Sequence, residues 1–274
     1  LMLAALLAVA LLASCGSSKK YIVLDDNFGA EEYAIGFRKE DYALAAKVQE
    51  ILDEMAADGT AGKIAEEWFG NKDAFLPGKE FTREMQTVER DDSQKYILDK
   101  GTLILGLDEN FPPMGYRDSE TGKIVGFDIS LAEEVAKRLG VKLETQPIDW
   151  NSKELELSGK TIDCIWNGFS INPERTEEMF MSKPYVANAQ VIIVAEDSPI
   201  KTKADLAGKK VAVQAGSSAI EAIKNDTATY DAIMNGGELV EFADNITAYL
   251  DLKAGRVDAF VVDKVVGEWI IKNN

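Results

Sequence analysis

The sequence has 274 residues, of which 46% are hydrophobic, so the chain can bury one core or two modest ones. Its formal net charge of −17 argues against a nucleic-acid-binding function, because phosphates attract basic surfaces. The chain has no histidine, which removes the commonest general base and the commonest metal ligand. We therefore expect no metal, no other cofactor and no nucleic-acid partner.

The N-terminal segment has the pattern of a secretion signal. The residues from Leu1 to Ser14 are almost wholly apolar and precede Cys15 and a polar run. The apolar stretch is shorter than the about 20 residues that span a bilayer, but it suits a signal peptide. Residues 12–15, Leu-Ala-Ser-Cys, resemble the lipobox of bacterial lipoproteins, which implies a signal peptide and lipobox over residues 1–15 and a lipid anchor at Cys15. A buried N-terminal helix is the alternative, although it would need a polar face.

After residue 20, short apolar runs alternate with amphipathic stretches, which is typical of an α/β fold. The predicted strands cover residues 21–25, 103–107, 141–146, 162–166, 191–195, 210–214, 239–242 and 259–263. The predicted helices cover residues 42–57, 62–69, 129–139, 218–224, 246–254 and 264–272. Asp41 is placed to cap the first helix and Gly140 to end the third. Residues 76–100 lack an apolar period and predict a linker, with a helical turn near residues 81–88.

Several polar and aromatic residues stand where strands end. Asp108 and Phe111 follow a strand, at the edge where parallel sheets place ligands. Arg175 lies on the first turn of a helix, where its charge opposes the helix dipole. A guanidinium can hold both oxygens of a carboxylate, so Arg175 is either a ligand contact or a solvated arginine.

The residues around the last two helices allow more than one role. Ser217 and Ser218 precede a helix, where one of them caps the N-terminus and the free N–H groups can also attract a carboxylate. Asp263 ends an apolar strand and precedes a helix, which by itself indicates a helix cap. Cys164 lies inside another apolar strand and is expected to be a buried thiol.

Residues 101–274 resemble the polar amino-acid family of solute-binding proteins of ABC transporters. The resemblance is carried, in shared order and spacing, by residues 106–114, 122–129, 136–140, 162–175, 180–185, 205–218, 252–259 and 262–263. It implies a two-lobed, type II periplasmic-binding-protein-like α/β fold with a hinge and a central cleft. The implied protein is a monomeric, extracytoplasmic lipoprotein, and not an enzyme. It captures a polar or cationic amino acid and delivers it to the permease subunits of an importer.

The resemblance also implies roles for individual residues. Arg175 binds the α-carboxylate and Asp263 the α-ammonium group, while Phe111 and Trp150 enclose the side chain. Trp150 can instead belong to the core. The other predicted contacts are polar or lie next to these residues: Asp108 at the far end of the ligand, with Asn167, Gly168, Ser170, Gln214, Ser217 and Ser218.

The order of the segments differs from that of the family. Residues 33–41, 57–64 and 67–70 match the last segment of the family but precede the rest here, so we expect a circularly permuted chain. Lobe 1 would then cover residues 36–187, including the linker 76–100, and lobe 2 residues 20–33 and 190–274. The crossings near Tyr33 and Asn188 would form the hinge.

Two other functions stay open. One is an amino-acid-sensing lipoprotein without transport, and the other is a dehydratase-like enzyme on the same fold. The resemblance leaves open which amino acid is bound.

Overall fold

The computed structural model describes residues 19–76, 80–81 and 90–273. Within these residues, nine strands form one sheet in the order β11-β10-β12-β9-β1-β7-β2-β6, with β8 paired to β1. The strands β3, β4 and β5 form a second, small sheet. The strands are β1 (Tyr21–Arg38), β2 (Thr102–Leu107), β3 (Asn110–Phe111), β4 (Gly115–Arg117), β5 (Ile124–Val125), β6 (Lys142–Pro147), β7 (Cys164–Ser170), β8 (Met179–Met181), β9 (Val186–Ala195), β10 (Lys210–Gln214), β11 (Glu238–Phe242) and β12 (Ala259–Asp263).

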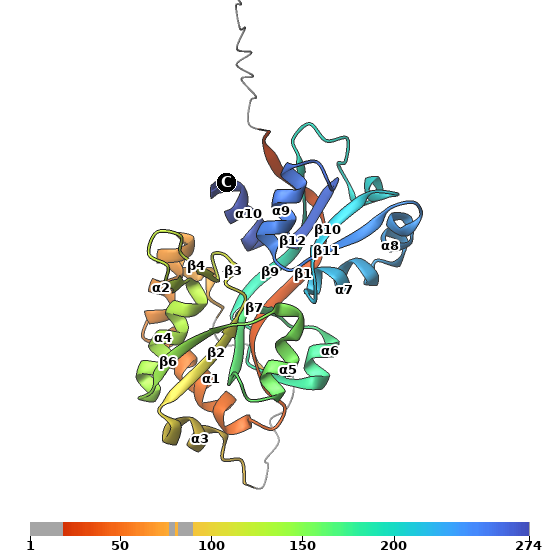
Figure 1. Ribbon diagram of the computed structural model, residues 1–274. Coiled ribbons are helices and arrows are strands. Elements are labelled where there is room, and N and C mark those ends of the chain that lie inside the picture. The colour runs from red at the N-terminus through yellow and green to blue at the C-terminus, as the bar shows by residue number, and fades with distance from the viewer. Residues whose placement is uncertain (1–18, 77–79, 82–89, 274) are drawn as a thin grey trace, which may run out of the picture.

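Helices cover both ends of the large sheet (Figure 1). The α-helices are α1 (Tyr42–Ala57), α2 (Thr60–Phe69), α3 (Ser93–Lys100), α4 (Phe127–Leu139), α5 (Lys153–Ser158), α6 (Pro173–Glu178), α7 (Ser218–Asn225), α8 (Thr227–Met234), α9 (Asn245–Lys253) and α10 (Lys264–Asn273). Three short 3-10 helices, η1 (Lys72–Ala74), η2 (Trp150–Ser152) and η3 (Lys203–Leu206), complete the described elements. None of these helices is long and apolar enough to cross a membrane.

The large sheet consists of two parallel groups joined by an antiparallel pair. Strand β10 is parallel to β11 and β12, and β2 is parallel to β6 and β7. Between the groups, β1 and β9 pair antiparallel from Tyr21 opposite Ala195 to Tyr33 opposite Val186. Figure 1 shows α7–α10 around the first group, which we call the β10 lobe, and α1–α6 around the second, the β2 lobe. The predicted two-lobed α/β fold is therefore confirmed.

Strand β1 is much longer than the predicted strand 21–25. It continues through residue 38 and lies between β9 and β7. Its pairing with β9 is irregular between Val23 and Asn27 and between Asn27 and Ala30. Such bulges interrupt the alternation of buried and exposed residues, so the apolar pattern does not reveal the whole strand.

The N-terminus of α1 is capped by a residue of the predicted linker. The side chain of Asp41 makes no capping hydrogen bond and instead forms an ion pair with Arg38, 2.7 Å from its Nε. The backbone N–H of Ala43 donates to Oδ2 of Asp91 at 2.6 Å. The prediction that Asp41 caps the helix is therefore wrong, because a buried arginine three residues earlier takes its carboxylate.

The predicted linker 76–100 is helical at its end. Helix α3 occupies residues 93–100 and buries Ile97, but an eight-residue helix is too short to show an apolar period. Gly140 ends α4 with a φ of 79°, as predicted, and Cys164 is buried, as predicted. Residues 1–15 with Cys15, and the predicted turn 81–88 apart from Phe81, lie outside the described residues.

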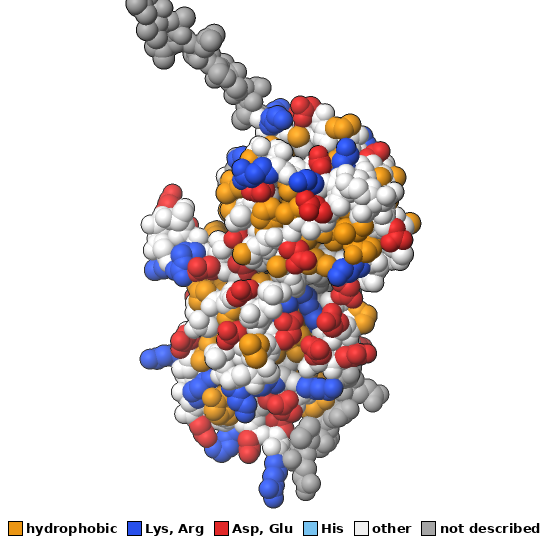
Figure 2. All heavy atoms as spheres, turned by 45° about the vertical axis from the view of Figure 1, so that its right-hand side comes forward, with side chains coloured by type: hydrophobic (Ala, Val, Ile, Leu, Met, Phe, Trp, Pro, Cys, Tyr) orange, Lys and Arg blue, Asp and Glu red, His pale blue; other side chains and the backbone are white. Residues whose placement is uncertain are grey.

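The surface of both lobes carries mixed charge. In the space-filling view, Asp and Glu side chains lie between Lys and Arg side chains across the visible face (Figure 2). On this face, acidic side chains do not gather at one place.

Candidate functional site

A row of polar side chains crosses the middle of the large sheet. Neighbouring strands bring these side chains together as directly opposed pairs, and opposed residues of antiparallel strands point to the same face of a sheet. The pairs, from β12 to β7, are Asp263 with Gln190, Asn188 with Glu31, and Tyr33 with Ser170. Because β1 and β9 connect the two lobes, this row lies at the hinge between them.

Asp263 is the acidic end of the row. Its Oδ1 accepts hydrogen bonds from the Tyr33 hydroxyl and from Asn188 Nδ2, each at 2.7 Å. Burial, and then the negative charge of Glu31, raise the pKa of Asp263 to about 7. A cation bound beside this carboxyl group would favour its charged form.

Arg175 is a buried cation. It lies on α6, where its N–H donates to the Asn172 side chain at 2.8 Å, and its Nη1 donates to the Ser170 carbonyl at 2.7 Å. The guanidinium carbon lies 4.1 Å from the centre of the Phe169 ring. No carboxylate of the described residues forms an ion pair with Arg175, whose pKa is lowered mainly by burial. The guanidinium is thus oriented by the protein and has capacity for a further anion.

The N-terminus of α7 faces the same place from the β10 lobe. Ser217 stands at the N-cap position, but its side chain makes no capping bond and instead donates to the Gln214 carbonyl at 2.7 Å. Ser218 Oγ lies 3.1 Å from Ser170 Oγ of the β2 lobe. Neither serine caps α7 with its side chain, so its first N–H groups remain open to an anion.

Asp108, Asn167 and Gln214 meet across the two lobes. The amide oxygen of Asn167 accepts from the backbone N–H of Asp108 at 3.0 Å. Gln214 Nε2 donates to Asp108 Oδ2 at 2.7 Å, and its Oε1 accepts from Asn245 at 2.9 Å. Burial raises the pKa of Asp108 to about 6. These three predicted residues therefore lie together, although protein groups already use their hydrogen-bonding atoms.

The two predicted aromatic residues contact neighbouring positions of β7. Phe111 packs beside Gly168, whose φ is +55°. A Cβ at residue 168 would lie only 2.6 Å from Cε1 of Phe111. Trp150 meets the ring of Phe169 edge-on, with ring centres 5.8 Å apart. Both Phe111 and Trp150 are buried, and no ring contact joins them in the described part of the chain. That they enclose a ligand side chain stays a prediction.

A cavity of about 480 Å³ opens between the lobes beside these residues. Its walls include Lys153 and Arg175 from the β2 lobe and Ser217 and Glu221 from the β10 lobe. Lys153 is buried, and its Nζ donates to the Gly216 carbonyl across the lobes at 3.0 Å. The cavity is within the range of small-molecule sites, about 300–1,000 Å³.

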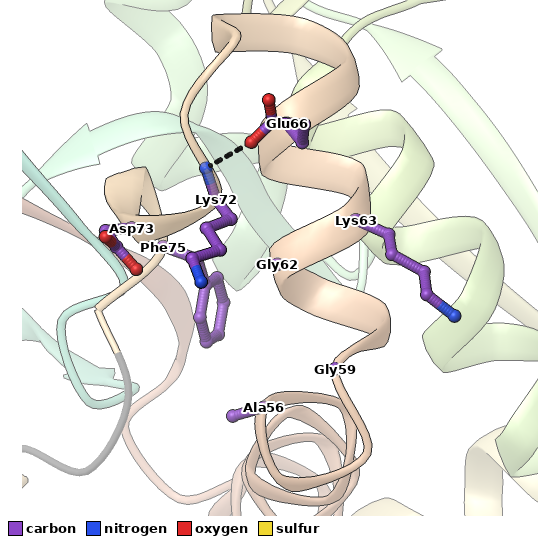
Figure 3. Close-up of a pocket in the computed structure, with 8 residues that line it drawn as sticks. All are labelled: Ala56, Gly59, Gly62, Lys63, Glu66, Lys72, Asp73 and Phe75. Atoms are coloured by element: carbon purple, nitrogen blue, oxygen red, sulfur yellow. Dashed lines mark hydrogen bonds between the residues drawn. The ribbon is translucent and has the colours of Figure 1, made fainter.

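A second cavity, of about 410 Å³, lies far from this row in the fold, between α2 and η1. Figure 3 shows Lys72 and Phe75 on one side of it, while Lys63 points away toward a neighbouring helix. The Glu66 carboxylate is already engaged by the Lys72 backbone N–H at 2.9 Å. The two lysines do not converge on a common point, so this cavity is not an anion site.

Among the polar residues of the site, Glu31, Tyr33, Asn188, Gln190 and Lys153 were not predicted as ligand contacts. Three of the four hinge residues in this group, Tyr33, Asn188 and Gln190, are buried. Side chains alternate between the two faces of a strand, so residues 31 and 33 share one face, as do residues 188 and 190. Applying this alternation to the two predicted crossings would have identified the hinge residues. Within residues 19–76, 80–81 and 90–273, no group of three or more Cys, Asp or Glu side chains is arranged to hold a metal ion.

Comparison with known proteins shows to which protein family the chain is related. The profile of bacterial extracellular solute-binding proteins, family 3, matches residues 103–244, which is more than half of the 274 residues. The L-cystine-binding protein TcyJ of Escherichia coli (strain K12) is 32% identical over 178 residues, or 64% of this chain. The match spans 64% of that relative, which is less than two thirds of its length.

Two solved structures extend the similarity to the fold. An ABC uptake transporter substrate binding protein from Streptococcus pneumoniae with bound histidine is 34% identical, with a TM-score of 0.63 over 66% of this chain and 73% of that chain. The arginine-bound form of truncated ArgBP from T. maritima is 38% identical, with a TM-score of 0.60 over 66% of this chain and 82% of that one. The chain belongs to the bacterial extracellular solute-binding proteins of family 3.

Proposed function

We propose that this protein binds one free amino acid, polar or cationic, in the cleft between its lobes and delivers it to an ABC importer. The observation that carries the proposal is Arg175, a buried guanidinium without an acidic partner among the described residues, next to Ser170 and opposite the N-terminus of α7. A buried charge is costly unless it is paired. A ligand carboxylate would supply that pair.

The two ends of the amino acid would bind to different groups. The α-carboxylate would lie on Arg175 and on the first N–H groups of α7, which attract anions. The α-ammonium group would lie near Asp263, whose carboxyl group is buried at the hinge. Because these groups belong to both lobes, ligand binding would favour the closed arrangement, which the importer then recognises.

The remaining parts of the proposal rest on the similarity to this protein family. TcyJ binds L-cystine, the two solved structures hold histidine and arginine, and the Streptococcus pneumoniae protein is the substrate binding protein of an ABC uptake transporter. These similarities support binding rather than catalysis here. We expect the protein to work as a monomer outside the cytoplasm, held to the membrane by a lipid on Cys15.

The chain order is a separate proposal, namely a circular permutation of the family fold. It is supported by the match to the family profile over residues 103–244, whereas β1, α1 and α2, which precede that range, pack within the same fold. The proposed lobes are residues 36–187, and residues 20–33 with 190–274. The hinge crossings are then the strands β1 and β9.

A thermal-shift screen against the twenty common amino acids, cystine and ornithine tests the proposed function. We expect at least one of them to raise the melting temperature in a concentration-dependent way, because a ligand that binds only the folded state stabilises it. An unchanged melting temperature at millimolar concentration of every compound would contradict the proposal.

A further inference from the structure

The Glu31 carboxylate lies inside the row of polar side chains at the hinge. Its Oε2 is within hydrogen-bonding distance of four uncharged donors: Ser170 Oγ at 2.7 Å, Gln190 Nε2 at 3.0 Å, Asn188 Nδ2 at 3.3 Å and Ser218 Oγ at 3.3 Å. Two of these donors belong to the predicted ligand site. Glu31 is therefore positioned at the cleft, although it lies on a strand that only crosses between the lobes.

Glu31 and Asp263 are two acidic groups that share one donor. The Nδ2 of Asn188 bonds Asp263 at 2.7 Å and lies 3.3 Å from Glu31. In the part of the chain that the structure describes, no Lys or Arg forms an ion pair with either carboxylate. Like charges this close disfavour each other, which is one reason why the pKa of Asp263 is raised. A bound cation would remove this repulsion.

The two amides between the carboxylates leave acceptors unused. Asn188 Oδ1 and Gln190 Oε1 are buried and have no hydrogen-bond partner among the residues that the structure describes. The carboxylates fix the orientation of these amides, because the N–H groups must face the negative oxygens. Buried acceptors without a donor are rare in folded proteins, and they indicate that this cluster is completed by a ligand that donates hydrogen bonds.

We propose that Glu31 is a second carboxylate for the ligand's ammonium group, and that together with Asp263 it restricts the site to ligands with a free primary ammonium. This inference rests on the proposed function and deepens it. A primary ammonium carries three N–H donors, which suit two carboxylates and one further oxygen of the hinge. An N-methylated amino acid lacks one of the three donors, and a hydroxy acid lacks the charge.

An alternative role for Glu31 is to compete with the ligand's own carboxylate for its binding groups. That role would bring Glu31 onto the guanidinium of Arg175, yet the two form no ion pair. All four groups around Oε2 are uncharged instead. The two roles predict opposite effects of removing the charge, because a competitor weakens binding and an ammonium partner strengthens it.

Titration calorimetry of Glu31→Gln, with L-arginine, L-histidine and L-cystine as probes, tests the proposal. Gln keeps the size of the side chain and removes its charge. We expect the tightest probe to bind Glu31→Gln about 10-fold or more weakly than wild type. Glu32→Gln is the matched control, because it removes the same charge from the other face of β1, and it should stay within about 3-fold of wild type.

Glu31→Asp keeps the charge and covers the case in which Glu31→Gln does not fold. Glu31→Asp should bind the tightest probe more tightly than Glu31→Gln does. If Glu31→Gln is unfolded, the affinity of Glu31→Asp for that probe should lie within about 30-fold of the wild-type affinity. The N-methyl derivative of the tightest probe should bind wild type at least about 10-fold more weakly than the parent. Equal or tighter binding by Glu31→Gln, or equal binding of the N-methyl derivative, overturns the role of Glu31 and leaves the proposed function intact. If wild type binds none of the probes or of the screened amino acids, the proposed function itself fails.

Discussion

Replacing Arg175 by Met should separate ligand binding from folding. In the empty protein the substitution removes the hydrogen bond from Nη1 to the Ser170 carbonyl, 2.7 Å long, and the contact with the Phe169 ring. These interactions contribute about 1.5–3 kcal/mol and about 0.5–2 kcal/mol. Against this loss, the substitution removes a buried charge that forms no ion pair with the described residues, and such a charge costs the folded state several kcal/mol.

The two contributions nearly cancel, so we expect Arg175→Met to change the melting temperature by less than about 5 °C. Ligand binding should respond very differently, because the ligand carboxylate would be left in the site without its charged partner. Loss of such a partner costs about 2–5 kcal/mol, or roughly a 30- to 5,000-fold loss of affinity. Met retains the apolar stem over Phe169, which keeps the packing comparable.

The measurement is titration calorimetry with the best amino acid from the thermal-shift screen, alongside a melting curve of the empty variant. Lys224→Met is the matched control, because Lys224 is exposed and lines the same cavity. It should keep its affinity within about 3-fold of wild type. Arg175→Met with undiminished affinity and a normal melting curve would refute the assignment of the carboxylate site to Arg175.

Three further changes give expected outcomes. Trp150→Ala should weaken binding by about 1–3 kcal/mol in calorimetry, and normal binding would assign Trp150 to the core alone. Burial raises the pKa of Asp128 to about 7, so the folded state keeps a proton that the unfolded chain releases near pH 4. The contribution of Asp128 to stability is therefore complete below about pH 4 and is lost as the pH rises to about 7, by about 1.4 kcal/mol per pKa unit of the shift. The melting temperature should fall over this interval, and a rise would contradict the reasoning. Joining Asn274 to Lys20 and opening the chain within residues 82–89 should leave folding and affinity unchanged, whereas an unfolded product would contradict the permutation.

The two-lobed fold could be predicted because its long elements have clear periods. Helix α1 and strand β12 have the predicted bounds, 42–57 and 259–263. Shorter elements, such as α5 with six residues and β8 with three, were missed because so few residues show no period. Strand β1 was cut short at residue 25 because its bulges break the alternation that marks a strand.

The charged members of the site could be predicted only in part. Arg175 and Asp263 stand at element ends with recognisable motifs, and the structure brings Arg175 beside Ser170 and Asp263 beside Tyr33. Glu31 has no such motif, since its role depends on pairing with β9, 157 positions away from Asn188 along the chain. The side chains of Ser217 and Asp41 were predicted as caps, but each instead interacts with a residue three positions earlier, Ser217 with the Gln214 carbonyl and Asp41 with Arg38.

The central claim is that the cleft holds one free amino acid by both its α-carboxylate and its α-ammonium group. The most direct test is a calorimetric comparison of the best amino acid with the amine that lacks its carboxylate and with the hydroxy acid that lacks its ammonium group. We predict that the amino acid binds one molecule per chain, and that each analogue binds about 100-fold more weakly or not at all. Either analogue binding as tightly as the amino acid would contradict the account.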